Sequence, residues 1–140
     1  MNTEYEINFS GQSMMPFISP GDALLVEKNI SDPQVGDVIL LHDGNELLAH
    51  RICEIKGNKV TTKGDRSCNI EVLKRDEIVA RVTQIKKESG NIVKLKDQKR
   101  LMRFMAYISS KYTWDKKRVL RGFWGRVVRL LNLFVTKSSR

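Results

Sequence analysis

The sequence predicts a mainly β domain followed by two amphipathic helices. Short apolar segments recur at roughly ten-residue spacing up to about residue 95, with glycine-containing turns between them, which is typical of an all-β barrel or sandwich. From about Asp97 the apolar residues change to helical spacing. We therefore divide the chain into a β domain, residues 1–95, and a basic amphipathic helical tail, residues 96–140.

The predicted strands each follow a turn. Ser19-Pro20-Gly21 precedes the first, and Asp43-Gly44-Asn45 is a hairpin signal between the second and the third. The predicted strands are Asp22–Lys28, Val38–His42, Leu47–Ile55, Lys59–Thr62, Ile78–Lys86 and Ile92–Leu95.

Two amphipathic helices are predicted in the tail. The first has apolar residues at Leu101, Phe104, Met105, Ile108 and Tyr112. The second is strongly cationic, and neither has the run of about 20 apolar residues that spans a bilayer. The residues expected to meet a membrane surface are Arg118, Arg121, Phe123, Trp124, Arg126 and Arg129.

Charge is unevenly distributed along the chain. Residues 1–94 hold 12 Lys and Arg against 14 Asp and Glu, whereas residues 95–140 hold 13 against 2. A basic tail of this kind indicates an anionic partner. An anionic membrane surface is favoured because aromatic residues lie between the arginines. Nucleic acid is a less favoured partner. The plainer alternative is that the helices only pack on the barrel and keep their basic faces in solvent.

The cysteines and the N-terminus indicate where the protein works. Cys53 and Cys68 form no Cys-x-x-Cys pair, so we expect reduced thiols, no metal site and no cofactor. Residues 1–10 contain no apolar run, so we expect neither a signal peptide nor an anchor there. The chain is expected to be cytoplasmic, with peripheral attachment at the inner membrane surface.

Ser13, His50 and Asp65 suggest a hydrolytic site. A serine hydroxyl becomes a good nucleophile when a base takes its proton and a third group orients that base. Each residue also has a plainer interpretation: a turn serine, a half-buried strand histidine and a turn aspartate. Arg51 points to the other face of its strand from His50 and is expected to form a structural ion pair.

Four short segments supply a context for these residues. They occur in order within about 60 residues and are similar to the boxes of the signal peptidase I and LexA-like repressor group of serine peptidases. The segments are Gly11-Gln12-Ser13-Met14-Met15-Pro16, Pro20-Gly21-Asp22-Ala23-Leu24-Leu25-Val26, Val35-Gly36-Asp37-Val38-Ile39, and the pair His50-Arg51 with Thr62-Lys63-Gly64-Asp65.

The resemblance implies a LexA or signal-peptidase-like β fold and a role for each residue. Ser13 would be the nucleophile, and its backbone N–H one oxyanion donor. His50 stands where bacterial signal peptidases have lysine, so the resemblance is to the Ser/His type of archaea and the endoplasmic reticulum. Asp65 would orient His50, and Glu71 falls where that type has a second acid and would share or take the role.

The same resemblance implies a serine endopeptidase that cleaves a leader or signal peptide in trans. Its substrate would bind as an extended strand, with small side chains before the cut. Some features depart from the pattern: Gly11 replaces the serine that many signal peptidases have two residues before the nucleophile, and we expect neither a membrane anchor nor a DNA-binding domain before Ser13. The alternative hypothesis is therefore a non-catalytic β-barrel binding module whose tail binds nucleic acid or a regulatory partner.

Overall fold

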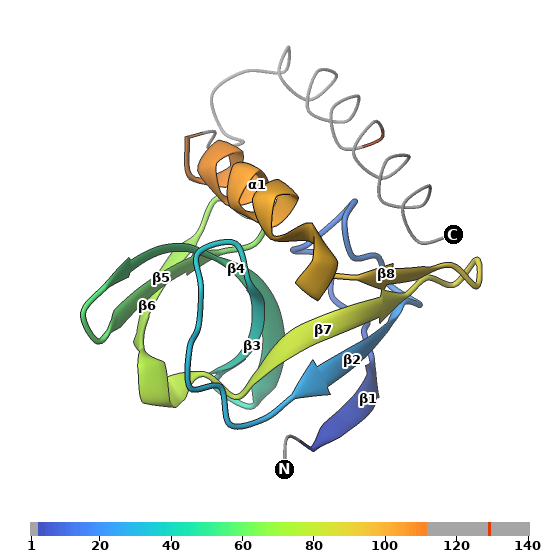
Figure 1. Ribbon diagram of the computed structural model, residues 1–140, viewed down its shortest axis with the longest axis horizontal. Helices are drawn as coiled ribbons and strands as arrows, with labels where there is room; N and C mark the ends of the chain where they lie inside the picture. Colours follow the sequence, from blue (N-terminus) through green and yellow to red (C-terminus); the bar gives the residue numbers. More distant parts are fainter. Residues whose placement is uncertain (1–2, 112–128, 130–140) are drawn as a thin grey trace.

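The structure, a computed structural model, describes residues 3–111 and residue 129. These residues form a curled antiparallel sheet with one α-helix against it (Figure 1). The strands are β1 (Glu4–Asn8), β2 (Ala23–Glu27), β3 (Val38–Asp43), β4 (Glu46–Lys56), β5 (Lys59–Lys63), β6 (Ile70–Lys74), β7 (Ala80–Lys86) and β8 (Ile92–Lys94). The helical elements are the 3-10 turns η1 (Arg75–Glu77) and η2 (Lys96–Gln98) and the helix α1 (Lys99–Lys111).

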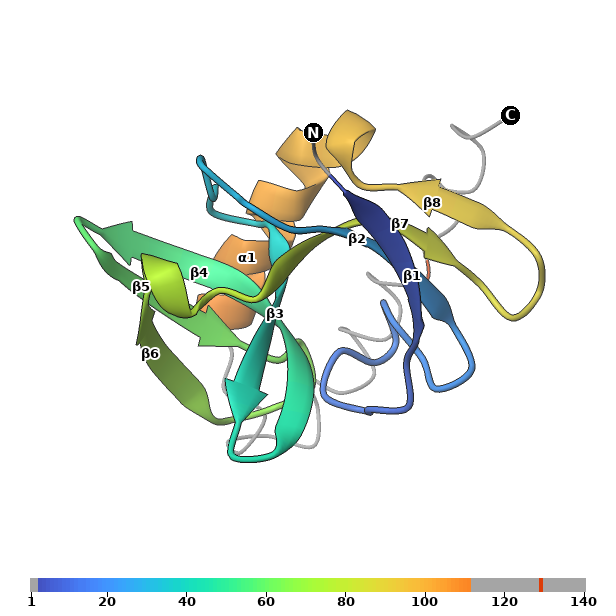
Figure 2. The ribbon, with the colours of Figure 1, turned by 90° about the horizontal axis from the view of Figure 1, so that it is seen from below.

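The strand order is β1-β2-β7-β3-β4-β5-β6, with β8 paired to β7. Each pairing is antiparallel. Seen from below, the sheet curves around on itself with α1 across one side (Figure 2). The predicted mainly β fold is thus confirmed, in the form of a half-closed barrel.

The six predicted strands all form, and two further strands were not predicted. The hairpin signal at Asp43-Gly44-Asn45 joins β3 to β4, and Gly44 has the positive φ of 60° that such a turn requires. The missed strands, β1 and β6, lie at the two ends of the strand order and bury few side chains, so they lack the apolar runs that mark the inner strands.

Two clusters of buried residues lie on opposite faces of β3 and β4. Val38 and Leu40 belong to the main core, and Ile39 belongs to the smaller second cluster. Both faces of these strands are therefore covered. In β4, Ile52 lies in the second cluster and Ala49 in the main core, so His50 shares the face of Ile52, and Arg51 shares the face of Ala49.

Helix α1 is part of the domain core. Its predicted position is confirmed, and its residues Met102, Met105 and Ala106 are buried in the main core together with residues of the sheet. Its backbone approaches Gly36 so closely that a Cβ at that position would lie 2.7 Å from the Met102 carbonyl carbon, and Gly36 has a φ of 99°. The helical and strand-rich parts of the chain therefore share one core across residue 95.

Candidate active site

Strand register brings His50, Thr62 and Glu71 to one face of the sheet. Ile52 is opposite Thr62, and Thr62 is opposite Glu71, while His50 is two residues from Ile52 on the same strand. The His50 ring is 3% exposed, and its Nδ1 lies 2.7 Å from Glu71 Oε2. The Thr62 hydroxyl donates to the same carboxylate oxygen at 3.4 Å.

Glu71, rather than Asp65, lies against Nδ1 of His50. Asp65 is held on the other face of β4 by Arg51, whose Nε and Nη2 donate to the two carboxylate oxygens at 2.8 and 2.7 Å. Both side chains are buried, at 0% exposure for Arg51 and 2% for Asp65. The structural ion pair expected of Arg51 is confirmed, and its partner is the residue that sequence reasoning had favoured as the orienting acid.

Arg51 also joins Asp65 to the rest of the core. Its Nη1 donates to the Gly36 carbonyl at 3.1 Å and to Met102 Sδ at 3.5 Å. The guanidinium lies 4.8 Å from the centroid of the Phe17 ring. The loop that carries Asp65 is thereby tied both to α1 and to the segment that follows Ser13.

Ser13 lies beside the strand that carries His50. Its hydroxyl donates to the carbonyl oxygen of Ala49, the residue before His50, at 3.4 Å. Its own carbonyl accepts a hydrogen bond from the Arg66 N–H at 2.7 Å. In this structure Ser13 Oγ and the His50 ring are not joined by a hydrogen bond.

Gly64 allows this close approach. A Cβ at Gly64 would lie 2.7 Å from the Ser13 carbonyl oxygen and 2.9 Å from Ser13 Cβ, closer than side-chain carbons come in proteins. Residues on both sides of Asp65 therefore contact the Ser13 backbone. The Arg51–Asp65 pair fixes the loop that holds the serine.

Lys63 is a buried cation that sequence reasoning passed over. It is 1% exposed, and its Nζ lies 3.4 Å from both the Gly64 carbonyl oxygen and Ser109 Oγ of α1. Burial lowers the pKa of Lys63, although the charge of Asp65 opposes this. Its position between Thr62 and Gly64, within the fourth sequence segment, was the only signal for it.

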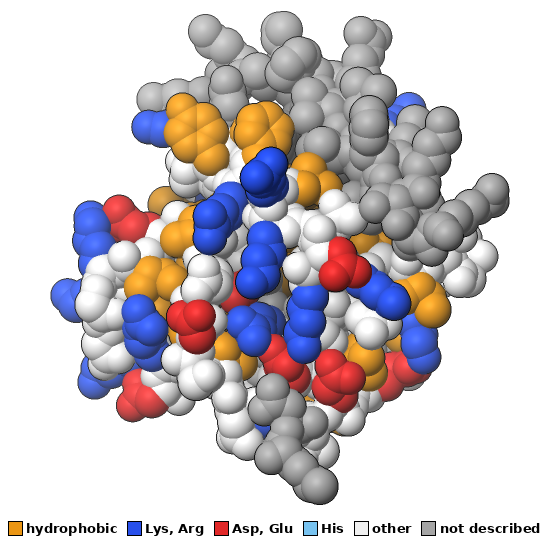
Figure 3. Space-filling view, in the orientation of Figure 1, with side chains coloured by type: hydrophobic (Ala, Val, Ile, Leu, Met, Phe, Trp, Pro, Cys, Tyr) orange, Lys and Arg blue, Asp and Glu red, His pale blue; other side chains and the backbone are white. Residues whose placement is uncertain are grey.

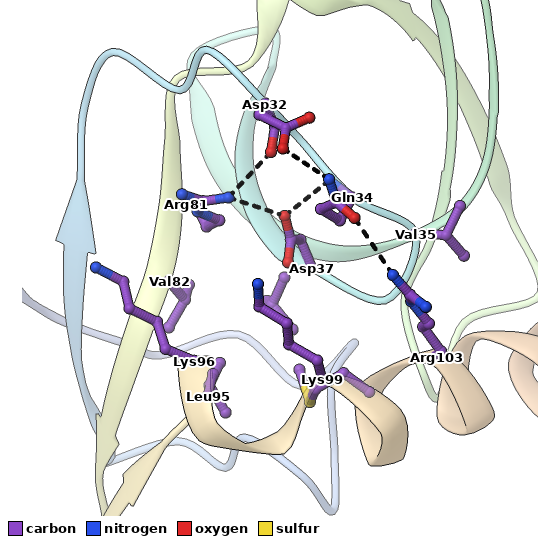
Figure 4. Close-up of a pocket in the computed structure, with 12 residues that line it drawn as sticks. Asp32, Gln34, Val35, Asp37, Arg81, Val82, Leu95, Lys96, Lys99 and Arg103 are labelled. Carbon is purple, nitrogen blue, oxygen red and sulfur yellow. Dashed lines mark hydrogen bonds and ion pairs between the residues drawn. The ribbon is translucent and has the colours of Figure 1, made fainter.

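A pocket of about 340 Å³ lies between the loop around Gln34, strand β7 and the start of α1 (Figure 4), and Ser13, His50 and Glu71 are not among the residues that line it. Arg81 donates to the carbonyl oxygen of Asp32 at 3.2 Å and to the carboxylate of Asp37 at 3.3 Å. Arg103 reaches Gln34 at 3.4 Å. Because these groups pair with one another, they fix the loop around Gln34 to β7 and α1.

Arg81 also pairs with Glu27, which is 2% exposed. Burial alone would raise the pKa of Glu27, but the hydrogen bonds and charges of Arg81 and Lys96 lower it overall. Burial acts against the charge of Arg81 as well, and Glu27 and Asp37 outweigh it, so the pKa of Arg81 is raised.

Apart from Arg129, the predicted second helix of the tail lies outside the described residues, as does Tyr112 of the predicted first helix. This holds for five of the residues expected at a membrane surface, Arg118, Arg121, Phe123, Trp124 and Arg126, whereas Arg129 is described and exposed. No helix in the described part of the chain has the length and apolar content needed to cross a membrane. Nor do the described residues contain a group of three or more His, Cys, Asp or Glu side chains suited to a metal ion.

Comparisons with known proteins identify the β domain. Neither the curated proteins nor the solved structures include a match to this chain. A family model described as Peptidase S24-like matches residues 2–83, which is more than half of the chain and includes Ser13, His50, Asp65 and Glu71. The chain therefore belongs to the Peptidase S24-like family.

Proposed function

We propose that this protein is a serine endopeptidase in which Ser13 is the nucleophile, His50 the base and Glu71 the acid that orients the base. The observation that carries the proposal is the 2.7 Å contact between Glu71 Oε2 and Nδ1 of the buried His50. Ser13 lies beside His50, because its hydroxyl donates to the carbonyl oxygen of the preceding residue, Ala49. With Nδ1–H donated to Glu71, the free Nε2 is the nitrogen that can accept a proton.

The proposed reaction is acyl transfer through Ser13. Oγ attacks the carbonyl carbon of the scissile bond while His50 Nε2 takes its proton, and the same nitrogen then returns the proton to the leaving amine. Before this, Ser13 Oγ must exchange its 3.4 Å hydrogen bond to the Ala49 carbonyl for one to His50. Such catalytic contacts are often loose without substrate and tighten when it binds.

Ser13 would also supply one oxyanion donor. Its backbone N–H has no hydrogen-bond acceptor among the described residues, so it is available to a developing negative charge. The substrate is proposed to be a leader or signal peptide bound as an extended strand and cleaved in trans.

Asp65 is proposed to be a positioning residue. Its buried pair with Arg51 holds a loop whose Gly64 and Arg66 backbones contact Ser13. In this assignment Asp65 acts on catalysis through the placement of the nucleophile, and Glu71 acts on the imidazole itself.

The alternative is a non-catalytic binding module built on the same fold. It is favoured by two observations, the absence of a hydrogen bond from Ser13 Oγ to His50 and the glycine at position 11. A binding module would keep its fold and its partner after substitution of Ser13 or His50.

The test is labelling of the purified chain with a serine-reactive acylating probe, read by intact mass. We expect wild type to label once, and Ser13→Ala and His50→Ala to lose labelling by orders of magnitude at a temperature where each variant is folded. The matched controls are Ser10→Ala and His42→Ala, which change exposed residues and should label to the same extent as wild type. Labelling that survives Ser13→Ala, or that ignores His50→Ala, would remove the support for a peptidase.

A further inference from the structure

Helix α1 has a second side that the domain core does not use. Its buried residues point to the sheet, while Arg100, Phe104, Tyr107 and Lys111 recur at four- and three-residue steps and form one outward stripe. Phe104 is 49% exposed and Tyr107 61% exposed. Hydrophobic side chains lie over α1 among Lys and Arg side chains on this face of the molecule (Figure 3).

The charges of α1 all have one sign. The helix contains Lys99, Arg100, Arg103 and Lys111 and no Asp or Glu. Lys111 Nζ lies 5.9 Å from the centroid of the Tyr107 ring, so cation and aromatic ring are presented together. Exposed rings flanked by long cationic side chains suit the boundary between lipid headgroups and acyl chains, where rings enter and charges meet phosphates.

We propose that the outer stripe of α1 docks on an anionic lipid surface and holds the domain there as a peripheral protein. This inference goes beyond the proposed peptidase function and does not depend on it. A lipid surface fits better than nucleic acid because phosphate contacts to nucleic acid need cations alone, whereas this stripe exposes two aromatic rings at its centre. The 13-residue helix lies on such a surface and does not cross it.

The fold holds this stripe in a fixed orientation relative to the sheet. Met102, Met105 and Ala106 anchor α1 in the main core, and the Gly36 contact fixes it against the loop before β3. A lipid surface bound to α1 would therefore orient the β domain as well as retain it.

The test uses the full-length chain and vesicles made of equal parts phosphatidylcholine and phosphatidylglycerol, with pure phosphatidylcholine vesicles as the uncharged control. We expect co-sedimentation with the anionic vesicles only, weakened by salt. Phe104→Ser with Tyr107→Ser should weaken binding on the order of tenfold or more, because two rings no longer leave water. A matched control, Ile70→Ser with Val72→Ser, replaces two similarly exposed apolar residues of β6 and should bind as wild type.

A second pair of variants separates charge from packing. Arg100→Gln with Lys111→Gln changes only exposed residues of the same stripe and should weaken binding about tenfold or more. Lys56→Gln with Lys59→Gln, on the β4–β5 hairpin, removes the same charge and should not. Thermal unfolding of every variant shows that the fold is kept.

Four results would overturn the inference. The first is failure of wild type to bind anionic vesicles, and the second is binding to duplex DNA with no binding to vesicles. The third is that both α1 variants bind the anionic vesicles as tightly as wild type does, which would assign the contact to the rest of the tail. The fourth is equal loss in the β6 or hairpin controls, which would make the contact non-specific.

Discussion

Exchanging each acid for its amide separates orientation of His50 from support of the fold. Asp65→Asn removes the charge from a pair in which Arg51 is 0% exposed and Asp65 2% exposed, joined by hydrogen bonds of 2.8 and 2.7 Å. Removing one partner of such a buried pair typically costs about 3–5 kcal/mol, because the other charge is left without compensation. That is a large part of the 5–15 kcal/mol by which a domain of this size is usually stable.

Glu71→Gln should behave in the opposite way. Glu71 is 30% exposed, so its charge is partly solvated, and glutamine keeps an oxygen for His50 Nδ1. We expect a loss of roughly 1 kcal/mol in the free energy of unfolding. Labelling of Ser13 by an acylating probe should nevertheless fall by about a hundredfold or more, because the amide orients the imidazole less strictly and does not stabilise its charged form.

The assay is urea unfolding of both variants beside the rate of probe labelling under conditions where each is folded. With a slope of about 2 kcal/mol per molar urea, a loss of about 4 kcal/mol moves the Asp65→Asn midpoint down by about 2 M. These assignments of Asp65 and Glu71 are refuted if Asp65→Asn is as stable as wild type and loses labelling, while Glu71→Gln labels normally. Asp65 would then be the orienting acid.

Three further predictions concern two buried charges and one close backbone contact. Burial lowers the pKa of Lys63 in the folded state below its usual 10.5, so the folded state binds fewer protons there than the unfolded state does. The free energy of unfolding should therefore rise with pH between the folded and the unfolded pKa of Lys63. Lys63→Met should flatten this rise when unfolding is measured across alkaline pH. Gly64→Ala should displace the Ser13 backbone and strongly reduce the rate of probe labelling at a temperature where the variant is still folded. Labelling at the wild-type rate would argue against the close contact between Gly64 and Ser13. Because Arg81 and Lys96 hold the pKa of Glu27 below its usual 4.5, the stabilisation that the Glu27 carboxylate supplies should be lost as pH falls through the lowered value. The stability of Glu27→Gln should therefore lie below that of wild type at neutral pH and approach it in acid, in unfolding measured at both pH values.

Local sequence was informative wherever one segment decides its own conformation. The Asp43-Gly44-Asn45 turn and the inner strands follow from backbone preferences and apolar runs, and α1 follows from its helical period. The edge strands β1 and β6 were missed because they bury few side chains and so lack the apolar runs that mark the inner strands.

The candidate site divides in the same way. Ser13, His50 and the two acids were all recognised from short segments, and the family match spans them. Which acid meets His50 depends on two successive pairings, β4 with β5 and β5 with β6, that place Glu71 on the face of His50. Lys63 was missed because a lysine in a motif gives no sign that it will be buried.

The sequence by itself determined the mainly β class, the position of the first helix, the basic character of the tail and the residues from which a Ser/His site can be built. Tertiary structure alone decided that Asp65 belongs to Arg51 and Glu71 to His50, and that α1 is anchored in the core while its aromatic and cationic stripe stays outside. The physical reason is that adjacent residues of a strand face opposite sides of the sheet. His50 and Arg51 therefore meet different partners, and only the register of the neighbouring strands says which.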